Sequence, residues 1–196
     1  MDYVMYCLDV ETTNLDDRLG DIIEVSIQRL TDSVQNTWWL KPFNPDGIDP
    51  GALRVNGHKI EDLLHKTAEG REKYLDPNKV IIDIENFIME DNVPNTNRII
   101  VGQNCQFDRG FLEQLWSKCN SKDTYPFGKR MLDTQIIEFF LDLCKGEMAE
   151  GYSLKNLTKK YGVVNSKAHT AEADVKATTE VLLKQIEFFK KALKKQ

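Results

Sequence analysis

The chain has 196 residues, of which 41% are hydrophobic and 29% are charged, and its formal net charge is −5. A chain of this length suits one domain around a single core, and we expect residues 1–196 to form that domain. The 11 glycines and 6 prolines are spread thinly, so composition excludes a disordered, collagen-like or low-complexity chain.

The apolar runs of the sequence are short. Residues 4–8, one of the longest, fall far below the ~20 residues that a membrane span needs, and Met1 and Asp2 begin no basic, apolar signal region. The four cysteines form no CxxC pair, which favours free thiols in a reducing compartment. We therefore expect a cytoplasmic protein with no membrane partner.

Charge is distributed unevenly along the chain. Residues 155–196 contain ten lysines and four acidic residues, a local charge of +6, so residues 1–154 carry −11. An acidic body with a basic segment can hold cations in one place and phosphates in another. A solvated lysine-rich helix face explains the same pattern, and charge alone leaves both interpretations open.

The first part of the chain favours strands. Residues 4–8 are continuously apolar, as in a strand covered on both faces. After a turn-like segment at residues 14–20, residues 23–27 alternate apolar and polar side chains, and residues 37–40 predict a third strand. Residues 43–76 are polar, contain proline and glycine, and favour short helices at most.

The rest of the chain alternates strand and helix. Residues 99–101 predict a short buried strand. Apolar side chains at helical spacing predict helices within residues 77–93, 111–119, 136–144, 154–161 and 175–193. Strands first, followed by alternating strands and helices, predict an α/β domain with a mixed central sheet.

Two carboxylates, Asp9 and Glu11, follow the first apolar run. Side chains at i and i+2 of a strand leave the same face, about 6.5 Å apart along the backbone. A hard divalent cation such as Mg²⁺ would explain adjacent like charges, because it takes carboxylate oxygens and keeps waters for substrate phosphates. Capping or surface exposure is the simpler interpretation of an isolated Asp-x-Glu pair.

Two later segments place acids near the starts of helices. Asp108 lies where the helix after residues 99–101 begins, and an N-terminal aspartate stabilised by the helix dipole is the alternative to a metal ligand. His169 precedes the long final helix, and Asp174 lies in the first turn of that helix. A histidine in this place is usually a surface residue, but beside a carboxylate-bound metal it can act as a general base.

Together these segments resemble the DEDD superfamily of 3′→5′ exonucleases, in its histidine-containing, DnaQ-like branch. That branch includes polymerase proofreading subunits, three-prime repair exonucleases and ribonuclease T. The motifs are Leu8-Asp9-Val10-Glu11-Thr12-Thr13, Asn104-Cys105-Gln106-Phe107-Asp108 and His169-Thr170-Ala171-Glu172-Ala173-Asp174, and the resemblance runs from about Tyr3 to Leu183. It implies a ribonuclease H-like mixed central β-sheet of about five strands flanked by α-helices.

The resemblance also implies the chemistry. Asp9, Glu11, Asp108 and Asp174 would bind two divalent metal ions, Mg²⁺ or Mn²⁺, and His169 would deprotonate the attacking water. Two ions ~3.5 to 4 Å apart can stabilise the attacking and the leaving oxygen of an in-line displacement. The expected reaction releases nucleoside 5′-monophosphates from a free 3′ end of nucleic acid.

Substrate-binding roles are implied for Thr12, Leu15, Asn104 and Phe107, around the 3′-terminal nucleotide. An aromatic ring such as that of Phe107 stacks on any base, as an exonuclease without sequence preference requires. Core packing is the alternative for Leu15 and Phe107. Asn104 would contact the substrate or hold its loop.

The sequence departs from the family in three places. Asn14 stands where relatives often have glycine, and an asparagine in the left-handed backbone conformation would keep the loop in shape. Asn56 stands where proofreading subunits tend to have the histidine of Val-His-Gly, which affects the grip on the terminal base. Residues 65–80 are longer and more charged than the family minimum. We interpret His58 and His65 as surface residues.

Several functions are open at this stage. We favour an exonuclease acting on single-stranded DNA rather than RNA, because the third motif looks closest to the three-prime repair type. An exoribonuclease similar to ribonuclease T or oligoribonuclease shares the motifs, and the choice depends on whether the site admits a 2′-hydroxyl. A non-catalytic nucleic-acid-binding module fits poorly with intact motifs, and neither GxxxxGK[ST] nor GxGxxG occurs to indicate another phosphate-binding enzyme.

The chain ends 22 residues after Asp174, so we expect no extra domain for docking to a polymerase. Several members of the resembling family form dimers, so a homodimer is also an option.

Overall fold

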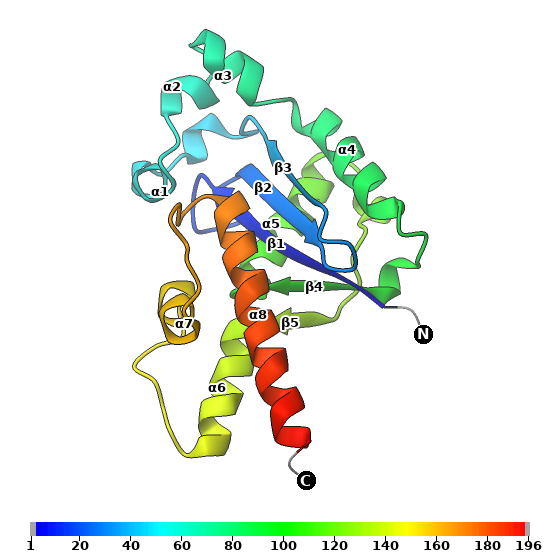
Figure 1. Ribbon diagram of the computed structural model, residues 1–196. Helices are drawn as coiled ribbons and strands as arrows, with labels where there is room; N and C mark the ends of the chain where they lie inside the picture. The colour runs from blue at the N-terminus through cyan, green and yellow to red at the C-terminus, as the bar shows by residue number, and fades with distance from the viewer. Residues whose placement is uncertain (1–2, 195–196) are drawn as a thin grey trace.

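A five-stranded sheet in the order β3-β2-β1-β4-β5 runs through the middle of the computed structural model, which describes residues 3–194 (Figure 1). The strands are β1 Val4–Thr12, β2 Ile22–Arg29, β3 Gln35–Trp39, β4 Arg98–Gly102 and β5 Met131–Asp133. β2 lies antiparallel to β1 and β3, whereas β4 lies parallel to β1 and β5. The predicted α/β fold with a mixed sheet of about five strands is confirmed.

Helices cover both faces of this sheet (Figure 1). Within the described residues the α-helices are α1 Pro50–Asn56, α2 Ile60–Leu63, α3 Ala68–Lys73, α4 Pro77–Met89, α5 Cys105–Lys118, α6 Thr134–Lys145, α7 Leu154–Tyr161 and α8 Ala171–Leu193. The helices α4 and α5 pack with one face of β1 and β2 around the largest apolar cluster. The helix α8 packs on the other face, with α6 beside it. The small helices α1 and α2 cover Ile23 of β2.

The alternation of side chains along β1 decides which way its acids point. Tyr6, Leu8 and Val10 belong to the core that α4 and α5 cover. Cys7 points to the opposite face, where it packs with Val175 of α8. Since successive side chains of a strand alternate between faces, Asp9 and Glu11 lie on the α8 face. The strand also continues to Thr12, so these acids lie within β1 rather than after its end.

The charged segment 65–80 has a structural role that its sequence did not reveal. Leu75 forms an isolated parallel bridge with Leu40, just after β3. Its N–H donates to Trp39 O at 3.0 Å, and its carbonyl accepts from Lys41 N at 3.0 Å. Tyr74 is buried between α1, α2 and β2. This insertion therefore extends the edge of the sheet.

His58 is not a surface residue, and that prediction is wrong. Its side chain is 4% exposed, with Nε2 at 3.2 Å from Glu24 Oε2 and Nδ1 at 2.6 Å from the Tyr74 hydroxyl. His65 is half-buried, with Nε2 at 2.7 Å from Tyr74 O. The insertion buries both rings because it folds back over α1 and α2, and sequence periodicity does not report such a contact.

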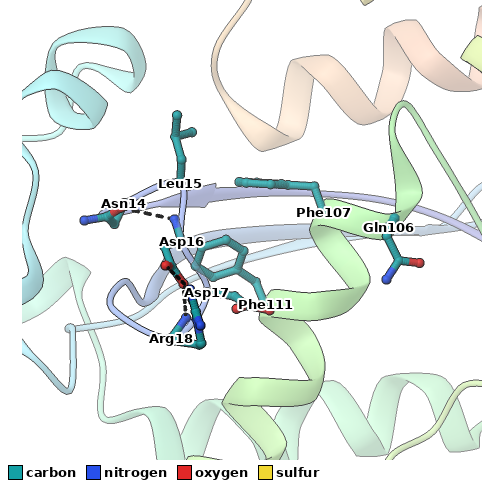
Figure 2. A pocket seen from close by; sticks show the side chains of 8 residues that line it. All are labelled: Asn14, Leu15, Asp16, Asp17, Arg18, Gln106, Phe107 and Phe111. Carbon is teal, nitrogen blue, oxygen red and sulfur yellow. Dashed lines mark hydrogen bonds and ion pairs between the residues drawn. The ribbon is translucent and has the colours of Figure 1, made fainter.

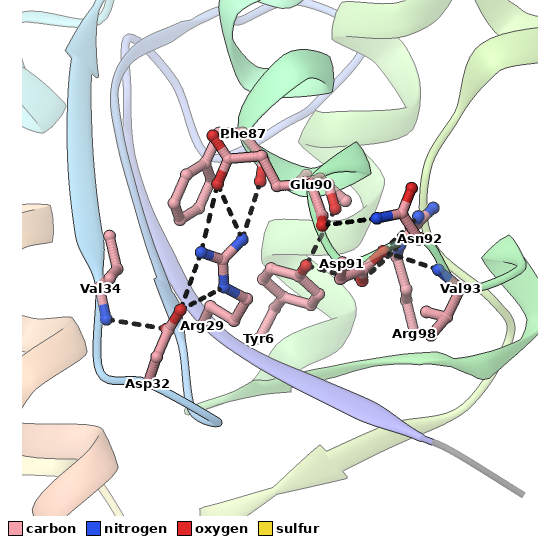
Figure 3. Close-up of polar contacts among 11 residues, drawn as sticks. Tyr6, Arg29, Asp32, Val34, Phe87, Glu90, Asp91, Asn92, Val93 and Arg98 are labelled. Atoms are coloured by element: carbon pink, nitrogen blue, oxygen red, sulfur yellow. Dashed lines mark hydrogen bonds and ion pairs between the residues drawn. The ribbon is translucent and has the colours of Figure 1, made fainter.

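A polar cluster joins the strands at the end of the sheet where β1 begins (Figure 3). Arg98 of β4 is 1% exposed and pairs with Asp91, with Nη2 at 2.6 Å from Oδ1. The hydroxyl of Tyr6 donates to the same carboxylate at 2.8 Å. Arg29 of β2 is bound by Asp32 and by Glu90, which follows α4. These contacts tie β1, β2 and β4 to the end of α4.

Other predictions concern the whole chain. All four cysteines lie in the described residues and carry free thiols. Nowhere in residues 3–194 is a helix both long and apolar enough to cross a membrane. The structure does not describe Met1 and Asp2, on which the prediction about a signal region rests. It also does not describe residues 195–196 at the end of the predicted domain.

Candidate active site

Three of the predicted metal ligands converge where β1 passes the start of α8. Oxygens of Asp9, Glu11 and Asp174 lie within 4.8 Å of one another. Asp9 and Glu11 share one face of β1, and that face lies against α8. The i, i+2 spacing puts Asp9 and Glu11 of the first motif on one face of β1. Packing of α8 on the sheet then brings Asp174 of the third motif to them.

Both carboxylate oxygens of Asp174 accept hydrogen bonds from the loop before α8. Asn165 Nδ2 donates to Oδ1 at 2.5 Å, and the backbone N–H of His169 donates to Oδ2 at 3.1 Å. Thr170 is the N-cap of α8, and its hydroxyl accepts from Ala173 N at 3.4 Å. The side chain of Asp174 is therefore oriented by its own loop, and the residue is 8% exposed.

Asp108 lies beside these three carboxylates but is held differently. It lies in the first turn of α5, is 3% exposed, and accepts a hydrogen bond from Val10 N at 3.1 Å on Oδ1. That bond ties α5 to β1 between Asp9 and Glu11. Asp108 is not part of the tight group of three oxygens, although after burial its charge contributes most to the raised pKa of Asp9.

Burial, together with repulsion between neighbouring carboxylates, disfavours the charged forms of Asp9 and Glu11, and burial disfavours that of Asp108. Burial, followed by the charges of Asp174 and Glu24, raises the pKa of Glu11 to about 8. Burial raises the pKa of Asp108 to about 7, and burial with the charges of Asp108 and Glu11 raises that of Asp9 well above its ordinary value. A divalent cation would replace the missing counter-charge, since carboxylate oxygens are its preferred ligands. The residues present fit such a cation.

His169 lies at the rim of this cluster. The residue is exposed, and its backbone takes the left-handed conformation with φ 68°. This conformation is uncommon for residues other than glycine, although asparagine, aspartate and histidine adopt it more often than other side chains. The N–H of His169 is held by Asp174, so the backbone of the predicted base is anchored directly to a predicted metal ligand.

An open hollow of about 640 Å³ lies between the loop after β1 and the start of α5 (Figure 2). Leu15 is 76% exposed, which excludes the core-packing alternative for this residue. The ring of Phe107 extends toward Leu15 and packs on Phe111 with ring centroids 4.9 Å apart (Figure 2). Phe107 is thus partly a core residue and partly a wall of the hollow.

The other two predicted substrate residues hold loops in this structure. Thr12 is 5% exposed, and its hydroxyl donates to Asn14 O at 2.7 Å. Asn104 is exposed and precedes α5 with φ 63°, and its carbonyl accepts from Phe107 N at 2.9 Å. Asn14 does not take the left-handed conformation, contrary to expectation. Its side chain instead bonds Gly47 O and Asp16 N, which holds the loop.

Two residues near the site, Glu24 and Asn165, were not predicted from the sequence. Glu24 lies directly opposite Glu11 in the register of β1 and β2, is 4% exposed, and accepts hydrogen bonds from Trp39 Nε1 at 3.0 Å and from His58. The alternation in residues 23–27 indicated only a polar position there. Asn165 lay in a segment without periodicity, and nothing in its neighbourhood indicated contact with Asp174.

A sequence profile of exonucleases, described as RNase_T, matches residues 6–182. The chain belongs to this exonuclease family. The match covers all three motifs, so the resemblance to 3′→5′ exonucleases of the DnaQ and ribonuclease T type is confirmed.

Individual relatives of this RNase_T-family chain are distant. It is 26% identical to a PolC-type DNA polymerase III of Thermotoga petrophila over 94% of this chain, and 23% identical to ribonuclease T of a Shewanella species over 91% of it. Solved structures of exonuclease I share its fold: one has a TM-score of 0.76 at 22% identity over 95% of this chain. Another, from E. coli and in complex with a dT13 oligonucleotide, has a TM-score of 0.71 at 20% identity over 94% of this chain.

Coverage of those relatives differs widely. The chain spans 12% of the PolC-type polymerase, 79% of the ribonuclease T and 41% of each of the two exonuclease I chains. The exonuclease domain is therefore what the chain shares with the longer proteins.

Proposed function

We propose that this chain is a metal-dependent 3′→5′ exonuclease that removes nucleoside 5′-monophosphates from the 3′ end of single-stranded DNA. The observation that carries the proposal is the convergence of Asp9, Glu11 and Asp174 oxygens within 4.8 Å beside the exposed His169. Three carboxylates at this distance can hold a divalent cation, and a histidine at their rim suits proton transfer.

Two divalent ions, Mg²⁺ or Mn²⁺, would be held by Asp9, Glu11, Asp108 and Asp174. Such ions supply charge stabilisation for the attacking and the leaving oxygen of an in-line phosphoryl displacement. The raised pKa values of Glu11 and Asp108 support this assignment, because a nearby cation offsets the cost of burying their negative charges.

His169 would take the proton of the attacking water. The residue is exposed, so a substrate can reach its imidazole, and the bond from its N–H to Asp174 holds its backbone at the carboxylates. An imidazole nitrogen can accept a proton from water, so His169 suits the role of general base. The leaving 3′-oxygen of the shortened strand would take up a proton from water, His169 would return its proton to the solvent, and the 5′-monophosphate would depart.

The terminal nucleotide would bind in the hollow at Leu15 and Phe107. An exposed leucine beside an aromatic ring offers a base both an apolar contact and a stacking face. Thr12 and Asn104 would contribute backbone and polar contacts from the loops that they hold. Single-stranded DNA is favoured because exonuclease I, with the same fold, has been seen with a dT13 oligonucleotide.

An exoribonuclease is the second candidate, and the similarity to ribonuclease T favours it specifically. Exonucleases acting on DNA and on RNA differ in whether a 2′-hydroxyl is accepted beside the terminal sugar.

A homodimer and a cytoplasmic location stay predictions. Analytical ultracentrifugation of the purified chain tests the first, and microscopy of a tagged chain in its own cells tests the second.

The deciding experiment incubates the chain with 5′-labelled single-stranded DNA and RNA of one sequence, in Mg²⁺, Mn²⁺ or EDTA. We expect a ladder that shortens from the 3′ end with either ion, none in EDTA, and faster cleavage of DNA. Asp174→Ala should abolish cleavage. The control Glu172→Gln alters an exposed acid of the same helical turn that pairs with Lys176, and should cleave normally. Faster RNA cleavage would select the second candidate, and no cleavage by a folded chain would overturn both.

A further inference from the structure

The loop between α7 and α8, residues 162–170, carries His169 and has few fixed points of its own. It leaves α7 through Gly162, which has φ 66°, and Val163 N donates to Thr158 O at 2.9 Å. At the other end the Thr170 hydroxyl donates to Lys167 O at 3.0 Å. Between these ends, Asn165 is half-buried and reaches across the loop to Asp174.

The contact of Asn165 with Asp174 fixes the orientation of the Asn165 amide. The amide nitrogen donates to the carboxylate at 2.5 Å. The reversed amide would set its oxygen against a carboxylate oxygen, so electrostatics requires this orientation. Oδ1 of Asn165 is buried and has no hydrogen-bond partner among the described residues. The bond to Asp174 is therefore the hydrogen bond by which the Asn165 side chain holds the loop.

We infer that Asn165 is a positioning residue that aims the Asp174 carboxylate and binds to it the loop carrying His169. Asn165 and the His169 N–H occupy different oxygens of Asp174. Rotation of that carboxylate would disturb both contacts together. Cation binding at Asp9, Glu11 and Asp174 and placement of the His169 imidazole thus depend on one amide. This inference rests on the proposed function for the role of His169.

The test uses Asn165→Leu, which keeps the approximate volume of the side chain and removes the donor. Mn²⁺ binding without nucleic acid is measured by calorimetry, because residues that orient a metal ligand typically contribute 10- to 100-fold to metal affinity. We expect Mn²⁺ to bind Asn165→Leu at least about 10-fold more weakly than the original chain. Half-maximal cleavage should need correspondingly more Mn²⁺, whereas a purely structural role would lower the melting temperature without shifting the metal dependence.

The matched control is Asn156→Leu. Asn156 is an α7 asparagine whose amide donates to Gly151 O at 3.1 Å, away from the carboxylates. Its Mn²⁺ affinity and cleavage should be unchanged. If Asn165→Leu does not fold, Asn165→Ala, which adds no apolar branch, replaces it in the same titration.

The coupling to His169 is tested with a double-mutant cycle. If Asn165 also places the imidazole, the loss of kcat in Asn165→Leu combined with His169→Ala is smaller than the product of the two single losses. Mn²⁺ affinity of Asn165→Leu within twofold of the original chain, or multiplicative losses of kcat, would overturn the inference. Failure of the original chain itself to bind Mn²⁺ or cleave would instead reject the proposed function.

Discussion

His169 illustrates how a single residue is kept in an unfavourable conformation. Its φ of 68° costs a non-glycine residue about 1 kcal/mol or more. The N–H of His169 donates to Asp174, and that bond offsets the strain at the cluster itself. A side chain on an extended backbone at this position would leave in another direction. The strained backbone of His169 therefore sets the direction of the side chain that we propose as the general base.

Replacing His169 with alanine separates proton transfer from cation binding. We expect kcat to fall by about 100- to 10,000-fold, the usual contribution of a general base. Mn²⁺ affinity should stay unchanged, because alanine keeps the N–H that bonds Asp174. Single-turnover cleavage and calorimetry measure the two quantities. A kcat within threefold of the original value would exclude His169 as the base.

At the scale of elements, β1 organises the site. Its even-numbered side chains enter the core under α4 and α5, and its odd-numbered ones face α8. Pairing with β2 sets Glu24 opposite Glu11, and the bond from Asp108 to Val10 N adds α5 to the same strand. One strand thus meets every element that supplies a carboxylate.

The buried acids in and around β1 make the metal-free fold sensitive to pH. The pKa of Glu11 is raised to about 8 and that of Asp108 to about 7, whereas in the unfolded chain such groups titrate near pH 4. Between about pH 5 and 8 the folded state therefore binds more protons than the unfolded state. The free energy of unfolding in EDTA should fall as pH rises through this range, by at most about 1.4 kcal/mol per pH unit for each proton.

Urea unfolding at four pH values between 5 and 8 measures this fall. Glu11→Gln, which removes one of the titrating groups, should give a shallower slope. A metal-free stability that rises across the same range would contradict the assigned burial of these carboxylates.

The opposite end of β1 supports the fold through the pair of Arg98 and Asp91. Both side chains are nearly inaccessible, at 1% and 4% exposed, so removal of one partner leaves a buried charge. Asp91→Ala should lower the free energy of unfolding by about 3 to 5 kcal/mol. Asp32→Ala, which breaks an exposed pair with Arg29, should lower it by about 1 kcal/mol or less. Equal effects in denaturant titrations would refute the distinction.

At the scale of the whole molecule, charge is separated along the chain. Residues 1–154 carry a net charge of −11 and supply Asp9, Glu11 and Asp108, whereas residues 155–196, which supply Asp174, carry a net charge of +6. The loop of His169 and the start of α8 lie in the basic part. Cations attracted to the first part and phosphates attracted to the second would meet where α8 passes β1, which agrees with the proposed substrate.

Cation binding should therefore stabilise the entire fold. Mn²⁺ at about 100 times its Kd adds about 2.7 kcal/mol to the free energy of unfolding, and for a chain of this size the melting temperature should rise by about 5 to 10 °C. Differential scanning fluorimetry with Mn²⁺ and with EDTA measures the shift. Asp174→Ala should show little shift, and an undiminished shift in that variant would place the cation elsewhere.

Much of this protein follows from local spacing. An Asp-x-Glu pair on a strand shares one face whatever the rest of the fold, and Asp108 and Asp174 lie in first helical turns because their segments start helices. The apolar periodicities likewise predicted most elements. β5 was not among the predicted strands, because three half-buried residues carry no periodic pattern.

Long-range packing decided the remainder. Pairing of β1 with β2 sets Glu24 opposite Glu11. Packing of the segments around α1 buries the His58 side chain against Glu24 and Tyr74. The loop with Asn165 folds onto Asp174 without any repeating pattern. Such contacts depend on which faces meet when strands pair and helices pack, and that information is absent from any window of neighbouring residues. The sequence therefore identifies the residues of the proposed chemistry. The residues that contact and orient them, such as Glu24 and Asn165, are identified only by the tertiary structure.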